Sequence, residues 1–265
     1  MMSDAVPPAP SGAAAADARL PLFFKRIEAL DSAAHRRLRL KPRESHAFAR
    51  GSNAIPLTFS EIPLAAQEYP IVFAGDGERL HLVALVGLTD ADNLFIGDDG
   101  RWQGRYVPAF VRSYPFALGQ ANGAQDDQFL LAIDPGADTL SDTEGAALFD
   151  ENGARTATLE RMVQFLSLYQ AQMDLARAFA RKMAELDLLV AVDANIRTHS
   201  GARYAMTGLR VVERESLQRL PDAIKLELFG SEWLEMIHHH FASLRSLPAL
   251  VDRLAARGAA AAAAA

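Results

Sequence analysis

Residues 156–189 decide the fold, and they read TATLERMVQFLSLYQAQMDLARAFARKMAELDLL. One set of side chains repeats every three or four residues, as on one face of an α-helix: Leu159, Met162, Leu166, Tyr169, Met173, Ala176, Ala180 and Met183. A second apolar stripe lies beside it: Phe165, Leu168, Leu175, Phe179 and Leu186. Two stripes make a wide apolar face, which predicts a buried central helix of about 45–50 Å at ~1.5 Å per residue. Thr156 or Thr158 would cap its start. A coiled coil needs only a narrow seam, so a homodimer through this helix is the alternative.

The residues before this helix predict strands joined by short turns. Two β-rich runs, residues 69–73 and 81–88, flank the turn Gly75-Asp76-Gly77 and predict a hairpin. Residues 106–111 and 129–133 predict two more strands. Thr58 and Glu61 have the spacing of a capping box, which predicts a short helix at about 61–67. Turns this short favour antiparallel pairing, because parallel strands need a long crossover.

The residues after the helix predict one hairpin followed by helices. The hairpin comprises residues 190–197 and 204–212 around His199-Ser200-Gly201, and a helical turn follows at 213–220. Residues 222–257 read as helical, with breaks near Gly230 and at Pro248. We therefore predict an α+β fold, with an antiparallel β-rich N-terminal part packed on a long central helix and a C-terminal helical part with one hairpin.

Composition predicts one folding unit between two low-complexity ends. Residues 1–18 are mostly small residues and proline, and 259–265 are all alanine, so we predict a disordered N-terminal tail, a single α+β domain over 19–258 and an alanine tail. The 265-residue chain is half apolar with a net charge of −6, which argues against nucleic acid as a partner. It has no cysteine, which excludes disulfides and thiolate chemistry.

Localisation follows from what the sequence lacks. No apolar run reaches ~18 residues, so we expect no transmembrane segment. The first 18 residues lack the basic start and the leucine-rich stretch of a secretory signal. We expect a soluble protein, cytoplasmic by default, with the cell surface reachable through signal-independent export.

No catalytic motif is present. The chain has no G-x-S-x-G elbow, no Walker loop and no G-x-G-x-x-G, so neither a hydrolase nucleophile nor a nucleotide cofactor has a recognisable setting, and we expect no cofactor. We place a ligand surface instead on the loop 46–53 and the aromatic segment 102–116, whose even-numbered aromatic residues would share one strand face. The candidate binding residues are His46, Arg50, Trp102, Tyr106, Arg112 and Tyr114.

A metal site is a further hypothesis. Glu235, His238 and His239 share a helix, and Glu235-Met236-Ile237-His238 has the Glu-x-x-His spacing of carboxylate di-iron proteins. A di-iron site needs a second such motif, which this chain lacks. Three successive histidines on a helix point about 100° apart, so His238-His239-His240 cannot converge on one ion.

Several segments together resemble the bacterial SapC family across residues 20–250. They are Pro21–Phe24, Tyr69–Phe73, Val83–Leu88, Asn93–Phe95, Gly100–Trp102, Tyr106–Phe116, Leu148–Asp150 and Leu217–Leu247. The family is associated by name with bacterial surface layers and serum resistance. The resemblance also implies flavin-dependent halogenase-like proteins and outer-membrane receptors as companions, which is an association and not a mechanism. The family has no established catalytic residues to carry over to this chain.

These observations favour a non-catalytic, soluble binding or accessory protein of the SapC family, with an unknown protein or small molecule as its partner. One alternative is a surface-layer-associated structural protein, which predicts calcium-dependent assembly. The other is an uncharacterised enzyme with a pocket near His46, Arg50 and Arg112. The balance leans away from an enzyme, because no nucleophile or acid–base set is recognisable.

Overall fold

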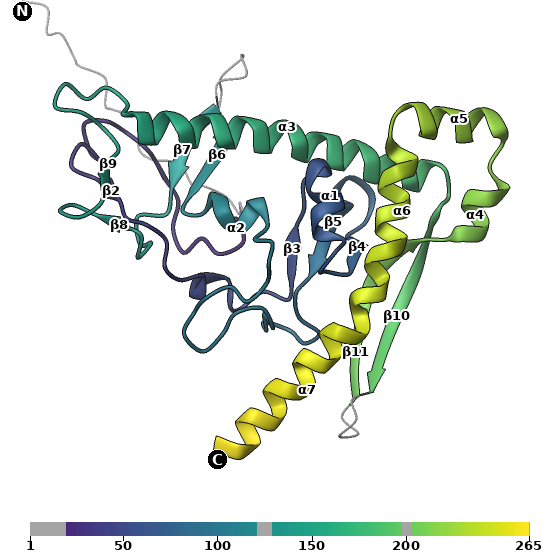
Figure 1. Ribbon diagram of the computed structural model, residues 1–265. Coiled ribbons are helices and arrows are strands. Elements are labelled where there is room, and N and C mark those ends of the chain that lie inside the picture. Colours follow the sequence, from purple (N-terminus) through teal and green to yellow (C-terminus); the bar gives the residue numbers. More distant parts are fainter. Residues whose placement is uncertain (1–19, 121–128, 198–202, 265) are drawn as a thin grey trace, which may run out of the picture.

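The long helix is the element on which the rest of the chain packs (Figure 1). In the computed structural model, which describes residues 20–120, 129–197 and 203–264, this helix is α3, Ala157–Glu185. Its N-cap residue is Thr156, one of the two residues predicted for that position. It ends about four residues earlier than predicted, because Asp187 adopts a positive φ of 52° and the chain enters strand β10 at Leu189.

The two apolar stripes of α3 are buried to different extents. Most of the first stripe is buried, including Leu159, Leu166 and Met183. In the second stripe only Phe179 is buried, whereas Leu168 and Leu175 are 63% and 44% exposed. The prediction of a wide buried face is therefore wrong for that stripe, because the sheets and short helices cover one side of α3 and leave its outer side open (Figure 1).

The largest sheet has five strands in the order β10-β11-β4-β5-β3, and all neighbours are antiparallel, as predicted. Its strands are β3 (Ala54–Pro56), β4 (Ile71–Ala74), β5 (His81–Leu85), β10 (Leu189–Arg197) and β11 (Arg203–Val212). The β4–β5 hairpin is confirmed, with the 3₁₀ turn η3 (Gly77–Arg79) in its connection. The β10–β11 hairpin is also confirmed, although its predicted turn at 199–201 lies outside the described residues.

Two small antiparallel sheets lie near the N-terminal half of α3 (Figure 1). One has the order β1-β7-β6, formed by β1 (Glu28–Ala29), β7 (Phe129–Ile133) and β6 (Phe116–Gln120). The other has the order β8-β2-β9, formed by β8 (Leu140–Ser141), β2 (Arg39–Leu40) and β9 (Ala146–Ala147).

The segment 106–111 is predicted as a strand but forms none, because residues 106–108 are irregular and 109–111 begin helix α2, Ala109–Ser113. Pro108 is its N-cap residue, and its carbonyl accepts hydrogen bonds from the amides of Val111 and Arg112. Proline at a helix start costs no intrahelical hydrogen bond, so this sequence can turn into a helix here. The even-numbered aromatic residues of 102–116 therefore do not share one strand face, and that prediction is wrong.

The predicted short helix and its capping box are confirmed. Thr58 and Glu61 make the reciprocal bonds of the box at the start of η2 (Phe59–Glu61), which leads into α1 (Ile62–Ala65). Another 3₁₀ turn, η1 (Ala47–Ala49), follows His46.

The C-terminal part is helical, as predicted. It comprises α4 (Arg214–Arg219), α5 (Asp222–Gly230), α6 (Trp233–Ser243), η4 (Leu244–Ser246) and α7 (Leu247–Ala264). The predicted break near Gly230 is confirmed, but the second break precedes Pro248, because proline fits the first turn of α7. The alanine run continues α7, in keeping with the high helix propensity of alanine. No helix within the described residues is long and apolar enough to cross a bilayer.

Helix α3 contributes to two separate apolar cores. Its C-terminal half places Phe179, Ala180 and Met183 in the larger core, with the five-stranded sheet and α6. Its N-terminal half places Leu159 and Leu166 in the smaller core, with β6 and β7. Met173 lies between them and is buried, yet it belongs to neither core. The two cores thus leave a seam along the middle of α3.

Candidate functional site

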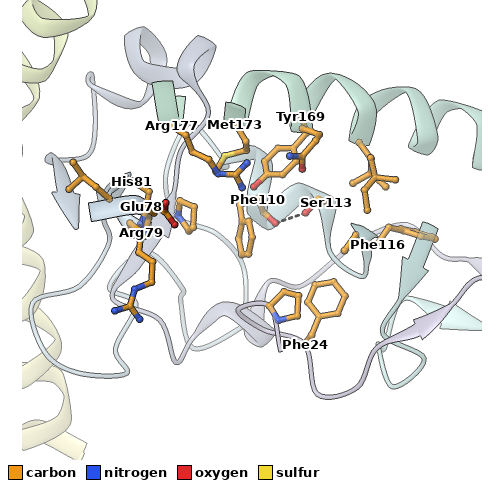
Figure 2. A pocket seen from close by; sticks show the side chains of 17 residues that line it. Phe24, Glu78, Arg79, His81, Phe110, Ser113, Phe116, Tyr169, Met173 and Arg177 are labelled. Atoms are coloured by element: carbon orange, nitrogen blue, oxygen red, sulfur yellow. Dashed lines mark hydrogen bonds between the residues drawn. The ribbon is translucent and has the colours of Figure 1, made fainter. Parts of the chain in front are cut away.

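A cavity of about 540 Å³ occupies this seam (Figure 2). That volume lies within the range of small-molecule sites. Six parts of the chain line it, namely the segment before β1, the end of β3, the β4–β5 connection with the start of β5, α2, β6 and the middle of α3. The lining residues are Pro21, Phe24, Pro56, Glu78, Arg79, Leu80, His81, Phe110, Ser113, Phe116, Ala117, Leu118, Leu166, Tyr169, Gln170, Met173 and Arg177.

The cavity has apolar walls and a polar group of side chains on the α3 side. Phe24, Phe110 and Phe116 supply aromatic surface from three elements. Figure 2 shows the hydroxyl of Tyr169 and the guanidinium of Arg177 pointing to the same region beside the Phe110 ring. Such a distribution, apolar surface with a few convergent polar groups, is typical of a site for a small amphipathic molecule.

Glu61 fixes helix α2 against the cavity. The residue is 4% exposed, and its carboxylate accepts hydrogen bonds from the Thr58 hydroxyl at 2.7 Å, the Tyr106 hydroxyl at 2.8 Å and the Ala109 amide at 2.5 Å. The last bond satisfies an amide at the start of α2, where backbone donors have no helical partner. The capping box that the sequence reveals thus also sets the position of Phe110 and Ser113.

A second, more polar cavity of about 750 Å³ lies on the other side of the 113–116 segment, where Tyr114 rather than Ser113 or Phe116 contributes to the wall. Its charged lining residues are Lys25, Lys41, Glu44, Asp138 and Glu144. Tyr114 stacks on Phe48 at 4.3 Å and donates from its hydroxyl to the buried carboxylate of Asp134.

Arg43 is held beside this second cavity. Its guanidinium lies 4.9 Å from the centroid of the Phe48 ring, and burial lowers the pKa of Arg43 to about 10. One of its nitrogens donates to the Tyr114 carbonyl, so the side chain ties residues 43–48 to the segment that separates the cavities.

Two of the sequence-predicted binding residues lie side by side. The rings of His46 and Trp102 are 6.0 Å apart, and the Trp102 indole donates to the Tyr69 hydroxyl at 3.0 Å. Burial, and then the positive charge of Arg43, lowers the pKa of His46. The His46 Nδ1 atom is buried and has no hydrogen-bond partner among the described residues.

The remaining predicted binding residues are occupied by contacts within the protein. Arg50 donates to the Gly97 carbonyl at 2.7 Å and so anchors a loop. Tyr106 donates to Glu61, whose charge adds to burial in raising the pKa of Tyr106. Arg112 donates to the Val107 carbonyl at 3.0 Å and lies over the Phe165 ring. His46, Arg50 and Arg112 thus have different partners, and none of the three lines the cavity at the seam.

Of the three proposed metal ligands, Glu235 and His239 lie close together and His238 has a different partner. His239 lies 3.5 Å from Glu235, one turn away on α6, and His238 bonds the Leu234 carbonyl through Nδ1 at 2.7 Å. Within residues that the structure describes, no three histidine or acidic side chains are arranged to hold a metal ion. The third histidine, His240, is buried and accepts the Val212 amide at 3.1 Å.

Sequence reasoning missed the residues that line the seam. The helical periodicity places Tyr169 and Met173 in the buried stripe of the helix, and it gives Arg177 no role. The one available signal was a tyrosine within an otherwise apolar stripe, since a buried hydroxyl usually needs a polar partner.

The fold and the site define an α+β protein with two cores on one helix and an apolar cavity between them. The family model for SapC matches residues 30–250, and the chain belongs to this family. No curated protein and no solved structure shows a significant match to the chain.

Proposed function

We propose that this SapC-family chain is a non-catalytic binding protein, and that its ligand is a small, largely apolar molecule held in the cavity at the seam. The observation that carries the proposal is the cavity itself, in which aromatic and aliphatic side chains from distant segments surround about 540 Å³. Apolar surface left uncovered by the fold gains free energy when a ligand removes it from water, at ~25 cal/mol per Å².

The chemistry of the lining supports binding rather than catalysis. Ser113 is the one serine among the described lining residues, and its hydroxyl donates to the Phe110 carbonyl at 2.8 Å. The one histidine, His81, bonds the Arg79 carbonyl through Nδ1 at 2.6 Å. A hydrogen-bonded nucleophile and base, which a covalent mechanism requires, does not occur among the described lining residues.

The test is a titration with N-phenyl-1-naphthylamine, a neutral probe whose fluorescence rises in apolar surroundings. We expect saturable binding to the full chain. Met173→Trp fills the cavity, and we expect it to weaken binding at least tenfold. The matched control is Leu175→Trp, two residues away on the same helix but 44% exposed and outside the lining. It should bind as the unchanged protein does.

Circular dichroism would establish that both variants are folded. Ala117→Leu narrows the cavity from β6 and replaces Met173→Trp if the latter does not fold. Absence of saturable binding to the unchanged protein, or equal binding by a folded cavity-filled variant, would overturn the proposal.

A further inference from the structure

Several of the polar side chains that line the cavity lie together on α3. Tyr169, Gln170 and Arg177 are contributed by α3 within about two turns of helix, next to the apolar Leu166 and Met173 of the same helix. The opposite walls, from the segment before β1, α2 and β6, present phenylalanine and aliphatic side chains. The cavity is therefore amphipathic, and the orientation of a bound molecule follows from that asymmetry.

Arg177 retains most of its hydrogen-bonding capacity. A guanidinium carries five N–H donors. Within the described part of the chain, its hydrogen bonding is confined to Asp174, through Nη1 at 2.6 Å. Asp174 is 60% exposed, and an ion pair this open to water is weak. The remaining donors of Arg177 can therefore bind a second carboxylate without losing a strong contact.

Tyr169 supplies a second donor beside Arg177. Burial raises the pKa of Tyr169, the negative charge of Glu61 raises it further, and the positive charge of Arg177 opposes both. The phenol thus stays protonated at neutral pH and can donate a hydrogen bond. The effect of the Arg177 charge on the pKa of Tyr169 agrees with Figure 2, in which the guanidinium and the phenol hydroxyl point toward the same region.

The other charges of the lining come from η3 and the start of β5. They are Glu78, Arg79 and the titratable His81. Arg79 offsets Glu78, and Figure 2 shows the Arg79 guanidinium directed away from the Phe110 ring. Arg177 is the cation among the lining residues that α3 contributes, and Asp174, its ion-pair partner, is not one of the lining residues.

We infer that the ligand is an aromatic monocarboxylate, with its carboxylate bound by Arg177 and the Tyr169 hydroxyl and its ring among Phe24, Phe110 and Phe116. This inference rests on the proposed function and names the ligand class. A charged hydrogen bond from a guanidinium stabilises a carboxylate more than a neutral group of the same shape. Aromatic walls favour a flat ring over an alkyl chain of equal area.

The experiment compares 1-naphthaleneacetate with 1-naphthaleneacetamide, which share a ring and differ in charge. Each displaces N-phenyl-1-naphthylamine from the full chain in competition titrations. We expect the carboxylate to bind about tenfold tighter than the amide, because it gains one charge-assisted hydrogen bond that the amide lacks. Arg177→Met keeps much of the apolar stem and should remove the preference, and Tyr169→Phe should reduce it.

The matched control is Arg181→Met, one turn further along α3, exposed and outside the lining. It should keep the full preference. If the probe binds but the carboxylate and the amide bind alike, or if Arg181→Met and Arg177→Met behave alike, the inference is wrong and the proposed function stands. If neither compound nor the probe binds, the proposed function fails with it.

Discussion

The two halves of α3 have different surroundings. In the C-terminal half, Phe179 packs against the rings of Phe59, Phe73 and Trp233 at centroid distances of 5.7, 6.1 and 5.8 Å, within a core that includes the largest sheet. In the N-terminal half, Leu159 and Leu166 lie beneath two-residue and five-residue strands. A helix of 29 residues is longer than either core, and where the cores fail to meet, its side chains line a cavity. The cavity therefore exists because one helix packs against two separate cores.

The largest expected effect comes from the larger core. Phe179→Ala should lower the free energy of unfolding by about 3–5 kcal/mol, because it removes a fully buried ring and leaves a void. Phe165→Ala, on the other half of α3 and only half-buried, should lower it by roughly 1–2 kcal/mol. Urea unfolding measures both. Equal losses would mean that the two halves are packed alike.

The next effect is a pH dependence of the free energy of unfolding, which arises from a histidine in the C-terminal part of the chain. Burial lowers the pKa of His240 to about 4, from about 6.5 in the unfolded chain. Its Nε2 accepts the Val212 amide, which requires that nitrogen to be unprotonated. The unfolded chain therefore takes up the proton first, and stability is lost as the pH falls from about 6.5 toward 4, by up to about 3 kcal/mol.

His240→Gln removes this titration. The variant should be less stable at pH 7.5, and its deficit relative to the unchanged protein should shrink as the pH falls to 4.5, because carboxylates titrate equally in both. Urea unfolding at several pH values gives the difference. A constant deficit across the range would show that His240 does not titrate in this window.

The smallest effect is expected on the outer side of α3. Leu168→Ser and Leu175→Ser should each change the free energy of unfolding by less than about 0.5 kcal/mol, because both side chains are exposed. The homodimer through this helix remains a prediction. A double variant that combines Leu168→Ser and Leu175→Ser tests it by sedimentation velocity. A dimer that dissociates in the variant would support it, and an unchanged sedimentation coefficient would remove it.

Local patterns in the sequence predicted the elements well. The spacing of Thr58 and Glu61, the start of α3 at Thr156 and the β4–β5 hairpin each depend on neighbouring residues, and each is confirmed. The strand prediction at 106–111 was wrong because a β-rich composition outweighed the helix-starting position of Pro108.

The candidate site could not be predicted in the same way. Phe24, Arg79, Phe116 and Arg177 come together only after α3 has packed on segments up to about 150 residues away in the chain. Periodic patterns in the sequence report local structure and do not indicate which distant segments come into contact. Candidate residues chosen for their chemical type, such as Arg50 and Tyr106, proved to be engaged by nearby backbone or by Glu61.

The most direct measurement uses two methionines of the same helix. With ¹³C-methyl methionine, the methyl resonances of Met173, at the seam, and Met183, fully buried in the larger core, are followed as N-phenyl-1-naphthylamine is added. If the probe binds in a cavity between the two cores, the Met173 resonance shifts with saturation while that of Met183 stays in place. An unmoved Met173 resonance at saturating probe, or an equal shift of both, would contradict a binding cavity between the two cores.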